Sequence, residues 1–153
     1  MDESLTALLE REHHEIDAGI EAFLEGLAQN EVRDHELTRS VEALRRHIYL
    51  EEEFLFPPLR ASGMLPPVLV MLREHGEIWR TLDAVEATEH QSDADGARQR
   101  CQYLLEQLAT HNAKEEPIIY PRGDAVLTEE AKRDLRAFID SGQMPLGWIC
   151  SRA

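Results

Sequence analysis

The segment REHHEI at residues 11–16 returns as REHGEI at residues 73–78, and HIYLEEEFLFP at residues 47–57 returns as HNAKEEPIIYP at residues 111–121. Each half of the chain therefore contains a histidine segment followed by a His-x-x-x-Glu segment. Imidazole and carboxylate groups are common ligands of iron, manganese and zinc. The duplication predicts a metal site to which both halves of the chain contribute.

The composition fits one soluble globular domain spanning residues 1–153, with 42% hydrophobic and 30% charged residues. A chain of this length can bury roughly 70% of the surface that it exposes when unfolded. The formal net charge of -14 argues against nucleic acid as a partner, because phosphate binding needs clustered lysine and arginine. No apolar run reaches the roughly 18 residues of a membrane span, and the first residues do not resemble a signal peptide. Cys101 and Cys150 show no disulfide framework, so we expect reduced thiols and a cytoplasmic location.

Four long segments carry apolar residues at helical spacing, and none alternates in the manner of a strand. These segments cover about residues 5–27, 37–55, 68–85 and 101–119. The proline pair at 57–58 is predicted to end the second helix, and residues 121–123 to end the fourth. A shorter fifth helix should begin after Thr128 as its N-cap and end near Gly142.

These elements predict an all-α fold. We expect an up-down-up-down four-helix bundle over about residues 4–122, followed by a short C-terminal fifth helix and a tail over about residues 127–153. The two halves of the bundle would be similar helical hairpins related by an approximate two-fold axis. The fifth helix and the tail would cover one end or one side of the bundle.

Helical phase decides which histidine of the first segment points into the bundle. His13 follows Leu9 by four residues and precedes Ile16 by three, so it lies on the apolar face of the helix. His14 is rotated from it by about 100° and shares its face with charged residues. We therefore predict that His13 points inward and that His14 is exposed.

The same test places five further polar residues on the apolar stripes of their helices. They are His47 and Glu51 in the second helix, His75 in the third, and His111 and Glu115 in the fourth. The four histidines lie at similar distances from the helix connections, so an antiparallel bundle should bring them into one layer. Burying four imidazoles and two carboxylates without a cation would cost several kcal/mol. This cost favours a metal site over a set of ordinary core residues.

The number of candidate ligands indicates two metal ions. Four histidines and two glutamates are too many for one tetrahedral zinc ion. Glu51 and Glu115 would face each other from two helices, where carboxylates can bridge a pair of ions. Iron, manganese and zinc all suit this mixture of nitrogen and oxygen ligands.

The motifs resemble those of hemerythrin-like proteins of the HHE cation-binding type, over about residues 4–122. The matching elements are His13-x-x-Ile16, His47-x-x-x-Glu51-Glu52 ending in Leu55-Phe56-Pro57, His75-x-x-Ile78, and His111-x-x-x-Glu115-Glu116 ending in Tyr120-Pro121. The resemblance implies a non-haem di-iron centre, with an oxo or hydroxo bridge, inside a four-helix bundle. Members of this family bind O₂ reversibly, sense oxygen or redox state, handle peroxide or nitric oxide, or help to repair iron centres.

The chain departs from the pattern of oxygen-carrying hemerythrins at two positions. Those proteins have a further histidine one turn after the third-helix ligand, where this chain has Trp79. Their last carboxylate is an aspartate five residues after the fourth-helix histidine, whereas Glu115 follows His111 by four. Fewer protein ligands leave coordination positions open for a small molecule. We therefore expect a protein that binds, senses or reduces O₂, peroxide or NO in a redox or stress response.

Several alternatives stay open at this point. The chain could instead store or deliver iron, or repair iron centres in a client protein, without turnover of a small molecule. The site could also hold zinc or manganese in a structural role. Enzymatic activity, a redox partner and the choice between monomer and homodimer are undecided, as is the pair of histidines that serves each metal.

Several residues near the candidate ligands have expected roles of their own. We expect Tyr49 and Tyr120 to pack as aromatic residues at the end of the bundle, with the alternative that they approach the centre as ligands or radical traps. Trp79 should form an apolar wall. Three glutamates could accept hydrogen bonds from ligand imidazoles, although exposure to solvent is their default state. They are Glu52, Glu53 and Glu116.

Overall fold

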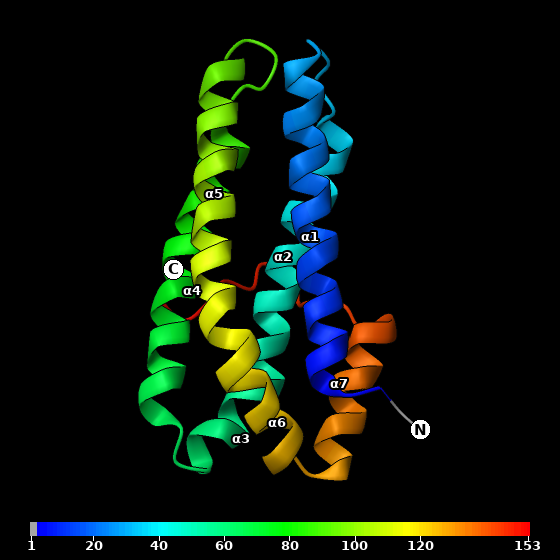
Figure 1. Cartoon of the computed structure of the whole chain (residues 1–153), viewed down its shortest axis with the longest axis vertical. Helices are drawn as coiled ribbons and strands as arrows, with labels where there is room; N and C mark the ends of the chain where they lie inside the picture. Colours follow the sequence, from blue (N-terminus) through cyan, green and yellow to red (C-terminus); the bar gives the residue numbers. More distant parts are fainter. Residues whose placement is uncertain (1–2) are drawn as a thin grey trace.

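The computed structural model describes residues 3–153, which contain helices and no strand (Figure 1). The long helices of this part are α1 (Leu5–Ala28), α2 (Asp34–Leu50), α4 (Leu65–Ala87) and α5 (Ala94–Lys114). They run side by side along the long axis of the molecule, with α1 packed on α2 and α4 packed on α5. The predicted all-α bundle of two helical hairpins is confirmed.

The helices of the motifs continue past their predicted ends. After α2 comes a π-helical turn η1 (Glu51–Leu55) and then α3 (Phe56–Ala61), and after α5 come η2 (Glu115–Ile119) and α6 (Tyr120–Val126). The prediction that prolines end these helices was wrong. The prolines instead lie in the first turns of α3 and α6, directly after the π-helical turns, and the first turn is the part of an α-helix that tolerates proline best.

The two π-helical turns begin at the glutamates of the duplicated motif. In η1 the N–H of Phe56 donates to the carbonyl of Glu51, and in η2 the N–H of Tyr120 donates to the carbonyl of Glu115. Residues five apart in an α-helix are rotated by about 140° from one another. The wider π turn brings such residues back to one face. Each turn therefore directs a glutamate and the aromatic residue five positions later toward the same region.

Two apolar clusters fill the bundle, one on each side of the histidine layer. The first contains Ile20, Phe23, Leu44, Ile78 and Leu104, and the second contains Leu9, Leu50, Leu55, Phe56 and Tyr120, among others. The histidines thus lie in a polar layer between two dry parts of the core. Such surroundings strengthen electrostatic interactions within the layer.

The predicted fifth helix is α7 (Glu129–Ser141), with the side chain of Thr128 accepting a hydrogen bond from the N–H of Ala131. It packs beside the lower half of the bundle (Figure 1). From its end at Gly142 the chain crosses the bundle and finishes against α4.

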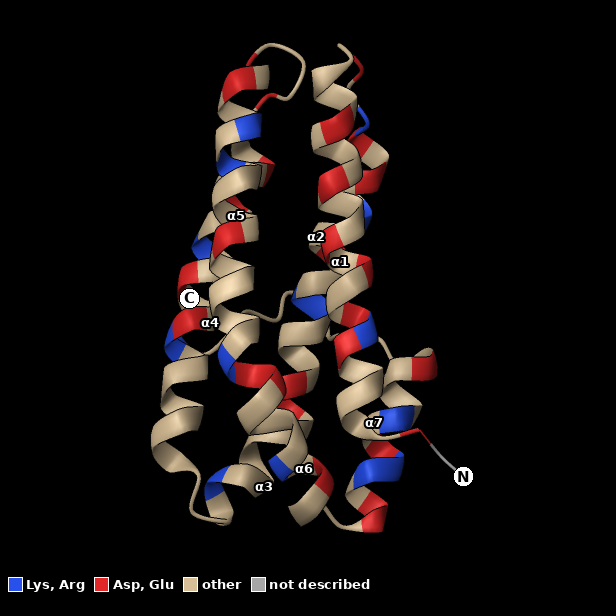
Figure 2. Ribbon diagram, viewed as in Figure 1, with Lys and Arg blue, Asp and Glu red and all other residues tan. Residues whose placement is uncertain are grey.

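Nearly all charged residues in the described part of the chain are at least partly exposed. Figure 2 shows aspartate and glutamate distributed along the long helices, with lysine and arginine scattered among them. None of the helices in residues 3–153 combines the length and apolar character needed to cross a bilayer.

Candidate metal centre

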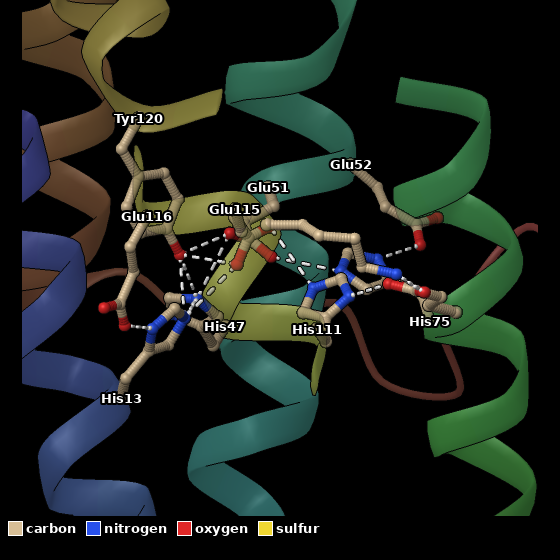
Figure 3. Close-up of polar contacts among 11 residues, drawn as sticks. His13, His47, Glu51, Glu52, His75, His111, Glu115, Glu116 and Tyr120 are labelled. Carbon is tan, nitrogen blue, oxygen red and sulfur yellow. Dashed lines mark hydrogen bonds and ion pairs between the residues drawn. The ribbon is translucent and has the colours of Figure 1, made fainter. Parts of the chain in front are cut away.

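Each long helix brings one histidine to a common layer, and the π turns bring the two glutamates (Figure 3). All six predicted site residues are buried and meet in this layer: His13, His47, Glu51, His75, His111 and Glu115. His14 is exposed, as helical phase predicted.

The six residues form two groups of four that share both carboxylates. One group is His13, His47, Glu51 and Glu115, and the other is Glu51, His75, His111 and Glu115. Within each group the potential ligand atoms all lie within 4.8 Å of one another. The histidines thus divide into one pair from α1 and α2 and one pair from α4 and α5, a division that the sequence left open.

Each carboxylate offers one oxygen to each histidine pair. Glu51 places Oε2 3.3 Å from His47 Nε2 and Oε1 3.1 Å from His75 Nε2. Glu115 places Oε1 3.3 Å from His13 Nε2 and Oε2 3.3 Å from His111 Nε2. This is the arrangement that two carboxylates need to span a pair of cations.

Orphaned polar atoms show that the protein alone does not complete the site. Within residues 3–153, Glu51 Oε1, Glu115 Oε2 and His75 Nε2 are buried and make no hydrogen bond of acceptable geometry, although Glu51 Oε1 and His75 Nε2 lie 3.1 Å apart. Buried polar atoms are nearly always hydrogen-bonded, so three orphans at one point require an explanation. All three belong to residues of the group that also contains His111. A bound cation would satisfy them together, and the residues therefore fit a metal.

The carboxylates and imidazoles of the layer shift one another's pKa values. Burial alone would raise the pKa of Glu51, but His47 and His75 outweigh it and hold that pKa well below the usual value. Burial would lower the pKa of His111, yet Glu115 and Glu74 raise it to about 10. His111 is thus protonated at neutral pH and lies opposite the ionised carboxylates. A metal ion binds the deprotonated ligands and takes the place of such a proton.

A glutamate accepts a hydrogen bond from the outer nitrogen of every histidine in the layer. The Nδ1–carboxylate distances are 2.8 Å for His13–Glu116, 2.8 Å for His47–Glu12, 2.8 Å for His75–Glu52 and 2.9 Å for His111–Glu74. Because a carboxylate only accepts, each Nδ1 carries the proton and each Nε2 faces the interior. Such partners fix the tautomer and orientation of ligand imidazoles.

We call the four glutamates that accept these hydrogen bonds the glutamate shell: Glu12, Glu52, Glu74 and Glu116. The sequence indicated only part of it. Glu52 and Glu116 have the suggested role, whereas Glu53 is exposed. Glu12 and Glu74 were missed because they lie one residue, or about 100°, away from the inward face of their helices. Their signal was present, since each directly precedes a site histidine in the repeated Arg-Glu-His segment.

Tyr120 is part of the site, so its preferred assignment to packing at the bundle end was wrong and the alternative, that it approaches the centre, is the one the geometry supports. Its hydroxyl lies 2.7 Å from Glu51 Oε2, 2.9 Å from Glu115 Oε1, and 2.8 Å and 3.0 Å from the Nε2 atoms of His13 and His47. The π turn η2 explains the error, because α-helical phase directs Tyr120 away from Glu115. Tyr49 does pack as predicted, against aromatic rings of α7 and the tail.

A small cavity adjoins the histidines, and five apolar side chains form part of its wall. Ile16, Leu44, Ile48, Ile78 and Leu108 line it together with the site residues. Trp79, the expected wall, is absent from this lining and packs instead against Trp148 and the guanidinium of Arg45. The remaining lining residues, Asp17 and Asn112, are partly exposed and mark the side of the cavity between α1 and α5.

The model of the hemerythrin HHE cation-binding domain matches residues 4–122. The chain belongs to this family. The match spans the four long helices and every residue of the two groups of four. It ends before α7 and the tail. Comparison with curated proteins and with solved structures finds no match. Family and geometry together show a hemerythrin-like domain with a buried histidine and glutamate cluster suited to a metal.

Proposed function

We propose that this hemerythrin-like chain holds two iron ions and uses them to bind, sense or reduce O₂, peroxide or NO. The observation that carries the proposal is the sharing of Glu51 and Glu115 by two histidine pairs. His13 and His47 would hold one ion, and His75 and His111 the other. Mixed imidazole and carboxylate ligands suit iron, and the pair would supply one-electron chemistry and open coordination positions when bound.

The surroundings of the site support a small ligand. The five apolar side chains in the cavity wall favour an uncharged diatomic or peroxide over a bulky or charged molecule. The two apolar clusters exclude water from both ends of the layer. Asp17 and Asn112 provide polar groups where the lining is partly exposed, and we place the entry of the ligand there.

Tyr120 gives the chain a proton donor at the site. Its hydroxyl has one proton, which it can donate to either shared carboxylate, and it contacts one histidine pair only. Burial and the two carboxylates raise its pKa well above the ordinary value, so the hydroxyl keeps that proton at neutral pH. It would stabilise the carboxylates while metal is absent and hold a proton near a ligand while metal is present.

The thiols support the proposed cytoplasmic location. Cys101 and Cys150 are both free and buried. Burial raises the pKa of each to about 11, which makes them poor nucleophiles. Free, inert thiols are usual in a reducing compartment.

Reconstitution with iron tests the proposal. The protein is loaded anaerobically with Fe²⁺, analysed for metal, and exposed separately to O₂, H₂O₂ and NO while the near-ultraviolet spectrum is recorded. A ferric pair formed with O₂ or peroxide, or a spectral change with NO, would support small-molecule chemistry. Iron that binds without any response would favour storage, delivery or repair of iron centres, and selective retention of zinc or manganese would contradict the proposal.

Removing a shared carboxylate tests the bridging role separately. Glu51→Ala and Glu115→Ala should each lower the iron content by at least one ion per chain, because each glutamate belongs to both groups. Glu53→Ala is the matched control, since Glu53 is an exposed neighbour in the same turn. Unchanged iron content in both site variants would refute bridging.

A further inference from the structure

The carboxyl-terminal tail, residues 142–153, contacts one half of the centre. The N–H of Ser151 donates to Glu52 Oε1 over 3.0 Å, and Glu52 Oε2 accepts from His75 Nδ1 over 2.8 Å. A continuous path of two hydrogen bonds thus runs from the main chain of the tail to a proposed ligand. Figure 1 shows the tail crossing the bundle to reach α4, which carries His75.

Gly76 gives the tail its place on α4. A Cβ at this position would collide with the carbonyl group of Arg152. The same carbonyl accepts a hydrogen bond from Arg80 Nη1 over 3.1 Å. Glycine weakens a helix interior, so a close approach of another backbone is a reason for its presence. The repeated segment has His14 at the equivalent position, where the side chain is exposed.

Trp148, which is partly buried, and Cys150, which is buried, anchor the tail just before Ser151 in the sequence. The indole of Trp148 meets the rings of Tyr49 and Trp79 edge-on, at centroid distances of 5.0 Å and 5.6 Å. Cys150 is only 3% exposed and belongs to the apolar cluster above the site. These contacts hold the Ser151 N–H in place against Glu52.

The other carboxylates of the shell lack this support. Glu116 is the equivalent of Glu52 in the repeat, but its side chain is 29% exposed against 5% for Glu52. Glu12 has Arg46 nearby, and Glu74 has Lys114, as further partners from the bundle itself. Within the described chain, Glu52 is thus the shell carboxylate that depends on the tail.

We propose that the tail is a strap that fixes Glu52, and through it His75, so that its docking sets the metal affinity of the His75–His111 position. The inference rests on the proposed metal pair. A carboxylate held by a second donor has fewer orientations and keeps water away from the imidazole N–H that it accepts. Release of the strap frees Glu52. The metal affinity of the position that contains His75 then falls, while the affinity of the position that contains His13 and His47 stays the same.

One pair of variants acts on the hydrogen bond between Ser151 and Glu52. Ser151→Pro eliminates the N–H donor, and Ser151→Ala keeps it at the same exposed position. A second pair acts on the docking surface. Gly76→Ala blocks the approach of Arg152 and at the same time favours the helix. His14→Ala places the same residue at the equivalent position of the other half, which the tail does not cover.

Two measurements are made on each full-length variant. Fe²⁺ is titrated anaerobically against a competing chelator to give the dissociation constants of the first and second ions. Thiol labelling of the metal-free protein compares Cys150, which lies in the strap, with Cys101, which lies in the bundle. Partners of ligand imidazoles typically alter metal affinity by about 10- to 100-fold.

We expect Ser151→Pro and Gly76→Ala to lower the affinity for one of the two ions by about 10-fold or more. Their controls should bind both ions as the unaltered chain does. Gly76→Ala should also speed the labelling of Cys150 and leave that of Cys101 unchanged. The strap proposal fails if Ser151→Pro binds both ions as tightly as Ser151→Ala does. It also fails if both ions lose the same affinity. Neither result would contradict the proposed pair of metal ions. An unaltered chain that binds no Fe²⁺ would instead refute the proposed function.

Discussion

Phe56 and Tyr120 occupy equivalent positions in the two halves of the chain, yet only Tyr120 brings a polar group to the centre. Each follows a shared glutamate by five residues and precedes a proline. The ring of Phe56 stacks on His75 at a centroid distance of 5.4 Å, whereas the hydroxyl of Tyr120 lies 2.8 Å from His13 Nε2. The two histidine pairs therefore have different surroundings despite the near symmetry of the ligand set.

Tyr120→Phe should destabilise the metal-free protein by about 1–3 kcal/mol, because buried carboxylate oxygens lose a donor. The number of bound ions should not change, since the hydroxyl is outside both groups of four. Urea unfolding and metal analysis measure the two effects. Tyr49→Phe is the control, because Tyr49 makes ring contacts with Phe138 and Trp148. Loss of one ion in Tyr120→Phe would show that the hydroxyl is itself a ligand.

Glu12→Ala and Glu74→Ala should each weaken one metal position by about 10- to 100-fold, because the outer nitrogen of a site histidine loses its acceptor. Glu12 holds His47 and Glu74 holds His111, so the two variants should weaken different ions. Competition titration with a chelator gives the affinities, and Glu53→Ala serves as the exposed control. Identical affinities in all three variants would mean that the shell does not position the ligands.

The stability of the metal-free protein should fall as the pH rises from 6.5 toward 10. The folded pKa of His111 is raised from 6.5 to about 10, so its contribution is complete below pH 6.5 and disappears as the pH approaches 10. The folded pKa of Glu74 is lowered from 4.5 to about 2, so its contribution is present above pH 4.5 and disappears toward pH 2. Maximal stability is expected between about pH 4.5 and 6.5.

Urea midpoints at pH 6 and pH 9 check this dependence. Bound metal needs neutral imidazoles, so the stabilisation by metal should grow over the same interval in which the metal-free protein weakens. His35→Gln is a control because His35 is exposed. A metal-free protein that is equally stable or more stable at pH 9 would contradict the assigned charges.

The sequence predicted the bundle and the six candidate ligands because both follow from helical phase, a local property. His13 could be chosen over His14 from the spacing of Leu9 and Ile16 alone. The partition of the histidines into pairs could not be predicted, because it depends on which helices pack together. Packing was preferred for Tyr120 for a different reason, since the π turn before it changes the helical phase that the apolar periodicity assumes.

The surroundings of the ligands depend on contacts between distant segments. Glu12 and Glu74 bond to histidines of neighbouring helices rather than to their own sequence neighbours. Ser151 reaches Glu52 across 99 positions of the chain. Gly76 was visible as a departure from the repeat, but its meaning requires the tail that covers it.

Two metal ions are proposed to share Glu51 and Glu115, and counting bound Fe²⁺ in histidine variants tests this sharing most directly. His13→Ala and the double variant His13→Ala/His47→Ala should each retain one ion per chain, because both changes fall in one group. His13→Ala/His75→Ala should retain none, although it removes the same number of histidines. One ion per chain in the unaltered protein, or equal counts in the two double variants, would contradict the account.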